Sequence, residues 1–128
     1  MEEFLAKPAG IWTGRILSGL PALGMVASGI GKVMQIQANL DAFAKLGIKS
    51  DLVLPIGVLE LVCVSLYLMP RTAVLGALLS TAYLGAAFFS HLRAGDPMMA
   101  PPIVFAVLLW AGLCAREPRL RALLPLRR

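Results

Sequence analysis

The chain has 128 residues, of which 59% are hydrophobic and 15% are charged, and its mean hydropathy is +0.80. Soluble domains average about 45–50% apolar and about 25% charged residues, and a soluble fold of this size has too little interior to bury so much apolar surface. This composition excludes an ordinary water-soluble domain. The net charge of +5 would suggest nucleic-acid binding in a soluble chain. Here the basic residues flank apolar segments, so we expect membrane lipid, and no nucleic acid, as their partner.

Four apolar segments approach the length of about 20 residues that a helix needs to cross a bilayer. They lie at about 13–34, 52–69, 71–92 and 99–115, and a basic tail follows at 116–128. Backbone groups in hydrocarbon are satisfied only in helices or closed barrels, and these segments are too long and continuous for barrel strands. The sequence therefore predicts an all-α integral membrane protein, with residues 1–128 forming a single four-helix transmembrane bundle.

The first span presents polar and small residues at steps of three and four, which places them on one face of a helix. This face includes Ser18, Met25, Ser28 and Lys32. The segment 42–50, AFAKLGIKS, follows the first span and contains the apolar residue Phe43. It is interpreted either as a short interfacial helix that covers the outer mouth of the bundle or as a plain connecting loop.

The second span, LVLPIGVLELVCVSLYLM, contains a single acidic residue, Glu60, and carries Tyr67 on the same helical face. An isolated carboxylate at the bilayer centre costs about 2.5–3.5 kcal/mol even on lenient insertion scales. We therefore expect Glu60 to pair with a cation, to bind water or to stay protonated. Gly57, three residues earlier, is predicted to leave open space beside Glu60.

The third span places Ser80, Tyr83 and His91 on one broad face, whereas the fourth has no strongly polar residue in its core. Too few ligands accompany His91 for a metal site, so none is predicted. The two cysteines, Cys63 and Cys114, lie inside apolar runs and are interpreted as buried thiols.

Four spans place both termini on one side of the membrane, and that side collects eight of the twelve basic residues. By the positive-inside rule, both termini are predicted to be cytoplasmic, in the inner membrane of the cell. With this orientation, Glu60 lies roughly 13 Å below the outer end of the second span at 1.5 Å per residue. Lys32 and His91 are near the outer ends of their spans, and a lysine stem is long enough to reach inward.

These depths predict that Lys32, Glu60 and His91 converge in the outer half of the bundle, with Tyr83 at a deeper level near Glu60. The predicted catalytic residues are Glu60, Lys32 and His91. The predicted ligand-binding residues are Tyr83, Ser28, Tyr67 and Met25. The competing interpretation is a structural ion pair, in which Glu60 and Lys32 only fix the register of two helices.

Several short motifs recur in a familiar order along the chain. They are SGIGK ending at Lys32, GVLE ending at Glu60, the turn Pro70-Arg71-Thr72, and the His91 region ending in Gly95-Asp96-Pro97. This order resembles the DoxX-like family of small four-helix membrane proteins over most of the chain from Trp12. The namesake of that family is the small subunit of a thiosulfate:quinone oxidoreductase, so the resemblance implies a membrane bundle and leaves binding of a quinone or a similar lipid open.

The leading functional hypothesis is a DoxX-like protein that binds a small lipophilic molecule of the quinone or isoprenoid type around Glu60. Acid–base or quinone-linked redox chemistry is the activity that these side chains could support. A quinone is the one cofactor that this hypothesis includes. The first alternative is a non-catalytic partner subunit of a larger membrane oxidoreductase complex. The second is a proton-coupled exporter, which is disfavoured because Lys32 would repel a cationic substrate.

Overall fold

The computed structural model describes residues 2–97 and 99–123, and within these residues it contains helices and no strand. Four long helices form the body of the molecule: α2 (Pro8–Val33), α4 (Val53–Leu68), α5 (Ala73–Ala94) and α6 (Ala100–Arg116). Shorter helices precede, connect or follow them: α1 (Glu2–Ala6), α3 (Gln37–Lys45), the 3-10 turn η1 (Ser50–Leu52) and α7 (Pro118–Arg121).

The long helices have the length and composition of membrane spans. Helix α2, the continuous segment Ser50–Leu68 and helix α5 are each apolar over at least 18 residues. Helix α6 is apolar over 17 residues, which is the lower end of the spanning range of about 17–25 residues. Large apolar side chains point outward along them, as with Leu23 at 68% exposure and Val107 at 61%. The fold is therefore an all-α transmembrane bundle whose outer surface contacts lipid.

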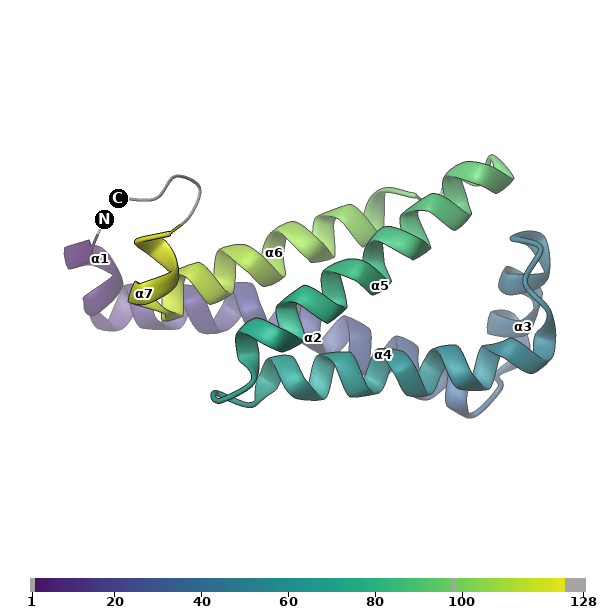
Figure 1. Cartoon of the computed structure of the whole chain (residues 1–128), viewed down its shortest axis with the longest axis horizontal. Coiled ribbons are helices and arrows are strands. Elements are labelled where there is room, and N and C mark those ends of the chain that lie inside the picture. The colour runs from purple at the N-terminus through teal and green to yellow at the C-terminus, as the bar shows by residue number, and fades with distance from the viewer. Residues whose placement is uncertain (1, 98, 124–128) are drawn as a thin grey trace.

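The four long helices pack in a ring, in which α2 contacts α4 and α6, and α5 contacts the same two helices from the opposite side. The short helices α1 and α7 lie together at one end of the bundle, and α3 lies at the other end (Figure 1). Helices α4 and α5 start close together at the turn after Met69 and diverge toward the end that carries α3 (Figure 1). The two ends of the bundle therefore differ in how closely the helices approach.

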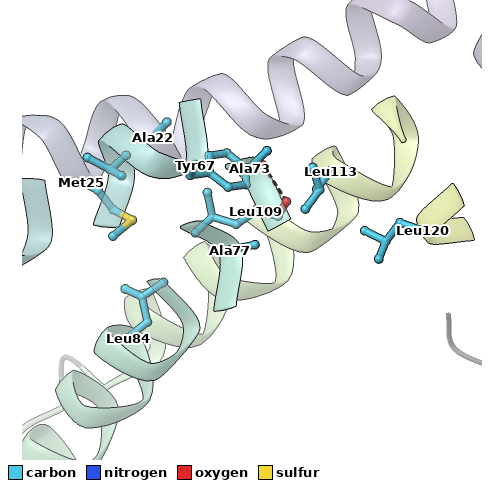
Figure 2. Close-up of a cluster of buried hydrophobic side chains, with 10 residues drawn as sticks. Ala22, Met25, Tyr67, Ala73, Ala77, Leu84, Leu109, Leu113 and Leu120 are labelled. Atoms are coloured by element: carbon cyan, nitrogen blue, oxygen red, sulfur yellow. Dashed lines mark hydrogen bonds between the residues drawn. The ribbon is translucent and has the colours of Figure 1, made fainter. Parts of the chain in front are cut away.

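The closely packed part of the bundle surrounds Tyr67, which is fully buried among the apolar side chains shown in Figure 2. Its hydroxyl donates to the carbonyl of Leu109 at 2.7 Å and lies 3.0 Å from the hydroxyl of Ser18. The guanidinium of Arg116 lies over the ring, 5.4 Å from its centroid. This one side chain of α4 thus contacts residues of α2 and α6, which ties three helices together.

Glycines make this close packing possible, because helices in a membrane associate through small residues that let backbones approach. A Cβ on Gly76 of α5 would lie 2.1 Å from the backbone nitrogen of Tyr67. A Cβ on Gly112 of α6 would lie 2.3 Å from the hydroxyl oxygen of Ser18. Both distances are far shorter than any van der Waals contact, so neither position accepts a larger residue without movement of a helix.

Helix α3 resolves the two interpretations of the segment after the first span in favour of a helix. It starts at Gln37, before the segment 42–50 in which a helix was considered, and it ends at Lys45. Left-handed backbone on each side, at Gln35 (φ 53°) and Gly47 (φ 78°), turns the chain so that α3 folds back at the end of the bundle. Arg93 of α5 fixes this position by donating a hydrogen bond of 2.8 Å to the carbonyl of Leu46.

The contact at Gly76 leads to a stability prediction with a control on the same helix. We expect Gly76→Ala to lower the free energy of unfolding by about 1–3 kcal/mol, because the added methyl group forces α4 and α5 apart. Gly85→Ala should be neutral or stabilising by up to about 1 kcal/mol, since a Cβ there meets nothing within 4 Å and alanine favours helix. Unfolding of both variants in detergent, followed by circular dichroism, measures the difference. Equal stability of the two variants would contradict the close packing described here.

Candidate functional site

A close crossing of α2 and α4 brings two charged side chains into contact, the only ones that are buried among the described residues. A Cβ on Gly29 would lie 2.7 Å from the side chain of Leu61, and a Cβ on Gly57 would lie 2.7 Å from the Cβ of Lys32. The sequence predicted that Gly57 leaves open space beside Glu60. That expectation was wrong, because the backbone of α2 and the first carbon of the Lys32 side chain occupy this space.

The crossing places the ammonium of Lys32 at 2.9 Å from a carboxylate oxygen of Glu60, where it donates a buried, charge-assisted hydrogen bond. The two side chains are only 9% and 4% exposed. The Lys32 ammonium also donates to the hydroxyl of Ser28, one turn earlier on α2, and lies 5.6 Å from the ring centroid of Phe43. A carboxylate, a hydroxyl and an aromatic face thus surround this ammonium.

The ion pair forms part of the wall of a cavity of about 370 Å³ at the α3 end of the bundle. Five of the residues predicted to form a site line this cavity: Ser28, Lys32, Glu60, Tyr83 and His91. These five residues come from α2, α4 and α5, and residues of α6 also line the cavity, so it lies among all four long helices. Tyr83 and Glu60 both belong to the lining of this cavity.

His91 is held more loosely than the ion pair. Its Nδ1 atom lies 3.5 Å from a carboxylate oxygen of Asp96, which is longer than a well-formed hydrogen bond. Within the described part of the chain this buried nitrogen makes no hydrogen bond. His91 lines the cavity together with Tyr83.

The structure does not bring Tyr67 and Met25 to this cavity, although the sequence placed both among the ligand-binding residues. Both side chains are fully buried in the apolar core (Figure 2). The Tyr67 hydroxyl is already engaged by Leu109 and Ser18. Helical periodicity put these residues on the correct inward face, but it gave no information on which part of that face is packed and which part borders open space.

Two segments that sequence reasoning did not assign to the site also line the cavity. Helix α3 contributes Asn39 and Phe43, followed by Leu46 just beyond its end, and α6 contributes Pro102 and Phe105. The spacing of the α3 residues is three to four, which is one face of a helix, so this signal was present in the sequence. The α6 residues are apolar. They could not be recognised from the sequence, because site residues were sought among polar side chains.

The chemistry available in the cavity is hydrogen bonding and proton transfer. Lys32, Tyr83 and His91 are able to donate hydrogen bonds to a carbonyl or hydroxyl oxygen, and Glu60 is able to accept a proton. Among the described residues, no three His, Cys, Asp or Glu side chains lie close enough together to hold a metal ion.

The geometry of the ion pair predicts the stability of three variants. We expect Glu60→Gln to lower the free energy of unfolding by about 3–5 kcal/mol, because the Lys32 ammonium is then buried without its carboxylate. Lys32→Met should lower the free energy of unfolding by a similar amount, because the Glu60 carboxylate is then buried without its ammonium partner. The double variant should recover at least half of the loss, since it removes both charges together. Denaturation of the four proteins in detergent gives the coupling energy, and strictly additive losses would show that the pair does not interact.

Comparison with known proteins places the chain in a family. The model of the DoxX-like family matches residues 16–112, a range that includes every residue lining the cavity. A search of curated proteins and a search of solved structures each gave no match. The family match confirms the resemblance inferred from the short motifs around Lys32, Glu60 and His91. Because it covers well over half of the 128 residues, this protein belongs to the DoxX-like family of membrane proteins.

Proposed function

We propose that this protein binds a small lipophilic molecule with a carbonyl or hydroxyl group, of the quinone or isoprenoid type, in the cavity beside Lys32 and Glu60. The observation that carries this proposal is a buried ion pair that borders a cavity of about 370 Å³ instead of being enclosed by packed side chains. Ligand sites of this kind combine a mostly apolar wall with a few convergent polar groups.

The cavity distinguishes this proposal from a purely structural ion pair. A pair that only fixed the register of α2 and α4 would need no open volume beside it, and open volume costs packing energy. Two further polar residues of α5, Tyr83 and His91, also line the same space. Ionisable groups inside a membrane are expensive, and they mark ligand or proton pathways more often than they serve packing alone.

The side chains divide into donors and one acceptor. Lys32, Tyr83 and His91 would hold the oxygen of the ligand, and Glu60 would exchange a proton with it. Such an arrangement supports acid–base catalysis or proton uptake linked to reduction of a quinone, with the electrons supplied by a partner protein. Enzymatic turnover would follow from binding of the ligand and is measured separately from it.

We also propose that the whole chain forms one domain in the inner membrane, with both termini in the cytoplasm. Helices α1 and α7 lie at the same end of the bundle (Figure 1). In the sequence, the side of the four spans that carries both termini collects eight of the twelve basic residues. Lysine and arginine are enriched in cytoplasmic segments, which supports this orientation. The cavity would then lie in the outer half of the membrane.

The binding proposal predicts a bound molecule that depends on Glu60. We expect protein purified from its native membrane to retain one lipophilic species, detected by mass spectrometry after extraction. Glu60→Gln should reduce its amount at least tenfold, because the carboxylate that positions the Lys32 ammonium and exchanges a proton with the ligand is lost. Asp51→Asn is the matched control, since Asp51 is an exposed carboxylate in η1 outside the cavity.

Equal recovery of the species from all three proteins would contradict the proposal. A different result would favour the role of a non-catalytic partner subunit. In that case one larger membrane protein would purify with the chain, and the activity of this complex in the membrane would be unchanged by Glu60→Gln. Extracts of the same membrane without the protein identify lipids that adhere to any sample.

The orientation predicts the outcome of reporter fusions. Green fluorescent protein joined after Arg128 should be fluorescent, because it folds in the cytoplasm, and alkaline phosphatase at the same point should be inactive. Phosphatase inserted at Gly95, between α5 and α6, should be active. Active phosphatase after Arg128 would show that the orientation is reversed.

A further inference from the structure

A second cavity of about 410 Å³ lies between α3, α4 and α5, and its wall is almost entirely apolar. The polar side chains among its lining residues are Tyr83, Ser90 and His91, all from α5. The remaining wall consists of aliphatic, aromatic and thiol side chains, such as Ile56 and Leu79. Its lining residues belong to α3, α4, α5 and the chain just after α3. Figure 1 shows that α4 and α5 diverge toward the end of the bundle that carries α3.

The apolar cavity adjoins the polar one. Five residues line both of them: Phe43, Leu46, Tyr83, Ala87 and His91. The polar cavity contains the ion pair and the apolar one does not. Tyr83 and His91 therefore stand at the boundary between a polar compartment and an apolar compartment.

The apolar cavity borders the lipid-facing surface of the bundle. Several of its lining side chains are strongly exposed, with Leu59 at 52%, Val62 at 50% and Leu79 at 40%. Ala82 and Ala86 of α5 are also exposed, and their small side chains leave the gap between α4 and α5 unfilled. In a bilayer this gap faces acyl chains, so a molecule dissolved in the membrane has a route to the cavity that avoids water.

We propose that the ligand is a single-chain amphiphile with an uncharged head, which enters from the bilayer between α4 and α5. Its head occupies the polar cavity at Lys32 and Glu60, and its chain lies in the apolar cavity along Ala82 and Ala86. This inference rests on the binding function proposed above. It adds the shape of the ligand and its path of entry.

The charges around the polar cavity argue for an uncharged head. The ammonium of Lys32 and the carboxylate of Glu60 neutralise each other at 2.9 Å. An anionic head would compete with Glu60 for Lys32, and a cationic head would compete with Lys32 for Glu60. A carbonyl or hydroxyl accepts or donates hydrogen bonds beside the pair without breaking it, and it enters a membrane cavity at lower cost than a charge.

The experiment compares a benzoquinone that carries a decyl chain with the same benzoquinone without the chain, using purified full-length protein in detergent and equilibrium dialysis. Ala86→Phe fills the apolar cavity from the lipid side. Ala27→Phe is the matched control, because Ala27 is an exposed alanine of α2 that lines neither cavity. Ala27 lies two residues from Gly29, at the depth where α2 crosses α4 beside the ion pair.

We expect Ala86→Phe to weaken binding of the decyl compound at least tenfold and to change binding of the chain-free compound less than twofold. Ala27→Phe should leave both affinities unchanged, whereas Glu60→Gln should weaken both. If Ala86→Phe changed neither affinity while Glu60→Gln lowered both, the chain site would be overturned and the binding function would stand. If Glu60→Gln changed neither, or if the unmodified protein bound neither compound, both proposals would be overturned.

A second measurement does not depend on the folding of a variant. A decyl compound with a diazirine at the end of its chain is photoactivated on the unmodified protein, and the labelled peptides are identified by mass spectrometry. Labels within residues 56–63 or 79–90, competed by the unlabelled decyl compound, are expected. Competed labels confined to other helices would overturn the proposed position of the chain.

Discussion

The close crossing of α2 and α4 is the contact on which the half of this bundle next to α3 depends. An acid in the middle of a membrane helix needs a partner within reach, because hydrocarbon offers no water to solvate its charge. Gly29 and Gly57 bring the two backbones so near that the first carbon of the Lys32 side chain fills the place of a Cβ at Gly57. The ammonium then reaches Glu60 at 2.9 Å, and both charges are buried together. This crossing gives the Glu60 carboxylate its partner.

The helices pack closely in one half of the bundle and leave cavities in the other. Around Tyr67, glycines at 76 and 112 let three helices close on one buried phenol whose hydroxyl is satisfied by Leu109. Toward the other end, α4 and α5 diverge, and α3 folds back where the chain takes left-handed backbone at Gln35 and Gly47. The bundle is therefore anchored at one end and hollow at the other. This division explains why inward-facing Tyr67 is packed while inward-facing Tyr83 borders a cavity.

The range matched by the family model includes the residues that line the polar cavity. The matched range 16–112 covers the four long helices in large part and omits α1 and α7, which lie at the anchored end. Lipid-facing and cavity-facing surfaces meet along α5, where Ala86 faces outward and Tyr83 and His91 face the two cavities. This arrangement is the basis of the proposed route by which a molecule in the membrane reaches the polar groups.

The sequence by itself determined that the chain lies in a lipid bilayer, that its fold is all-α and that it belongs to its family. Apolar segments of spanning length and short motifs are local properties of the chain. It also indicated that Lys32, Glu60, Tyr83 and His91 would meet, since helix rise and alternating direction give each residue a depth. Only the tertiary structure decided that Gly57 is filled by α2, that Tyr67 and Met25 belong to the packed core, and that α3 and α6 complete the cavity. These features depend on the distance between helices and on their divergence. Both follow from packing among all four helices, which no single segment encodes.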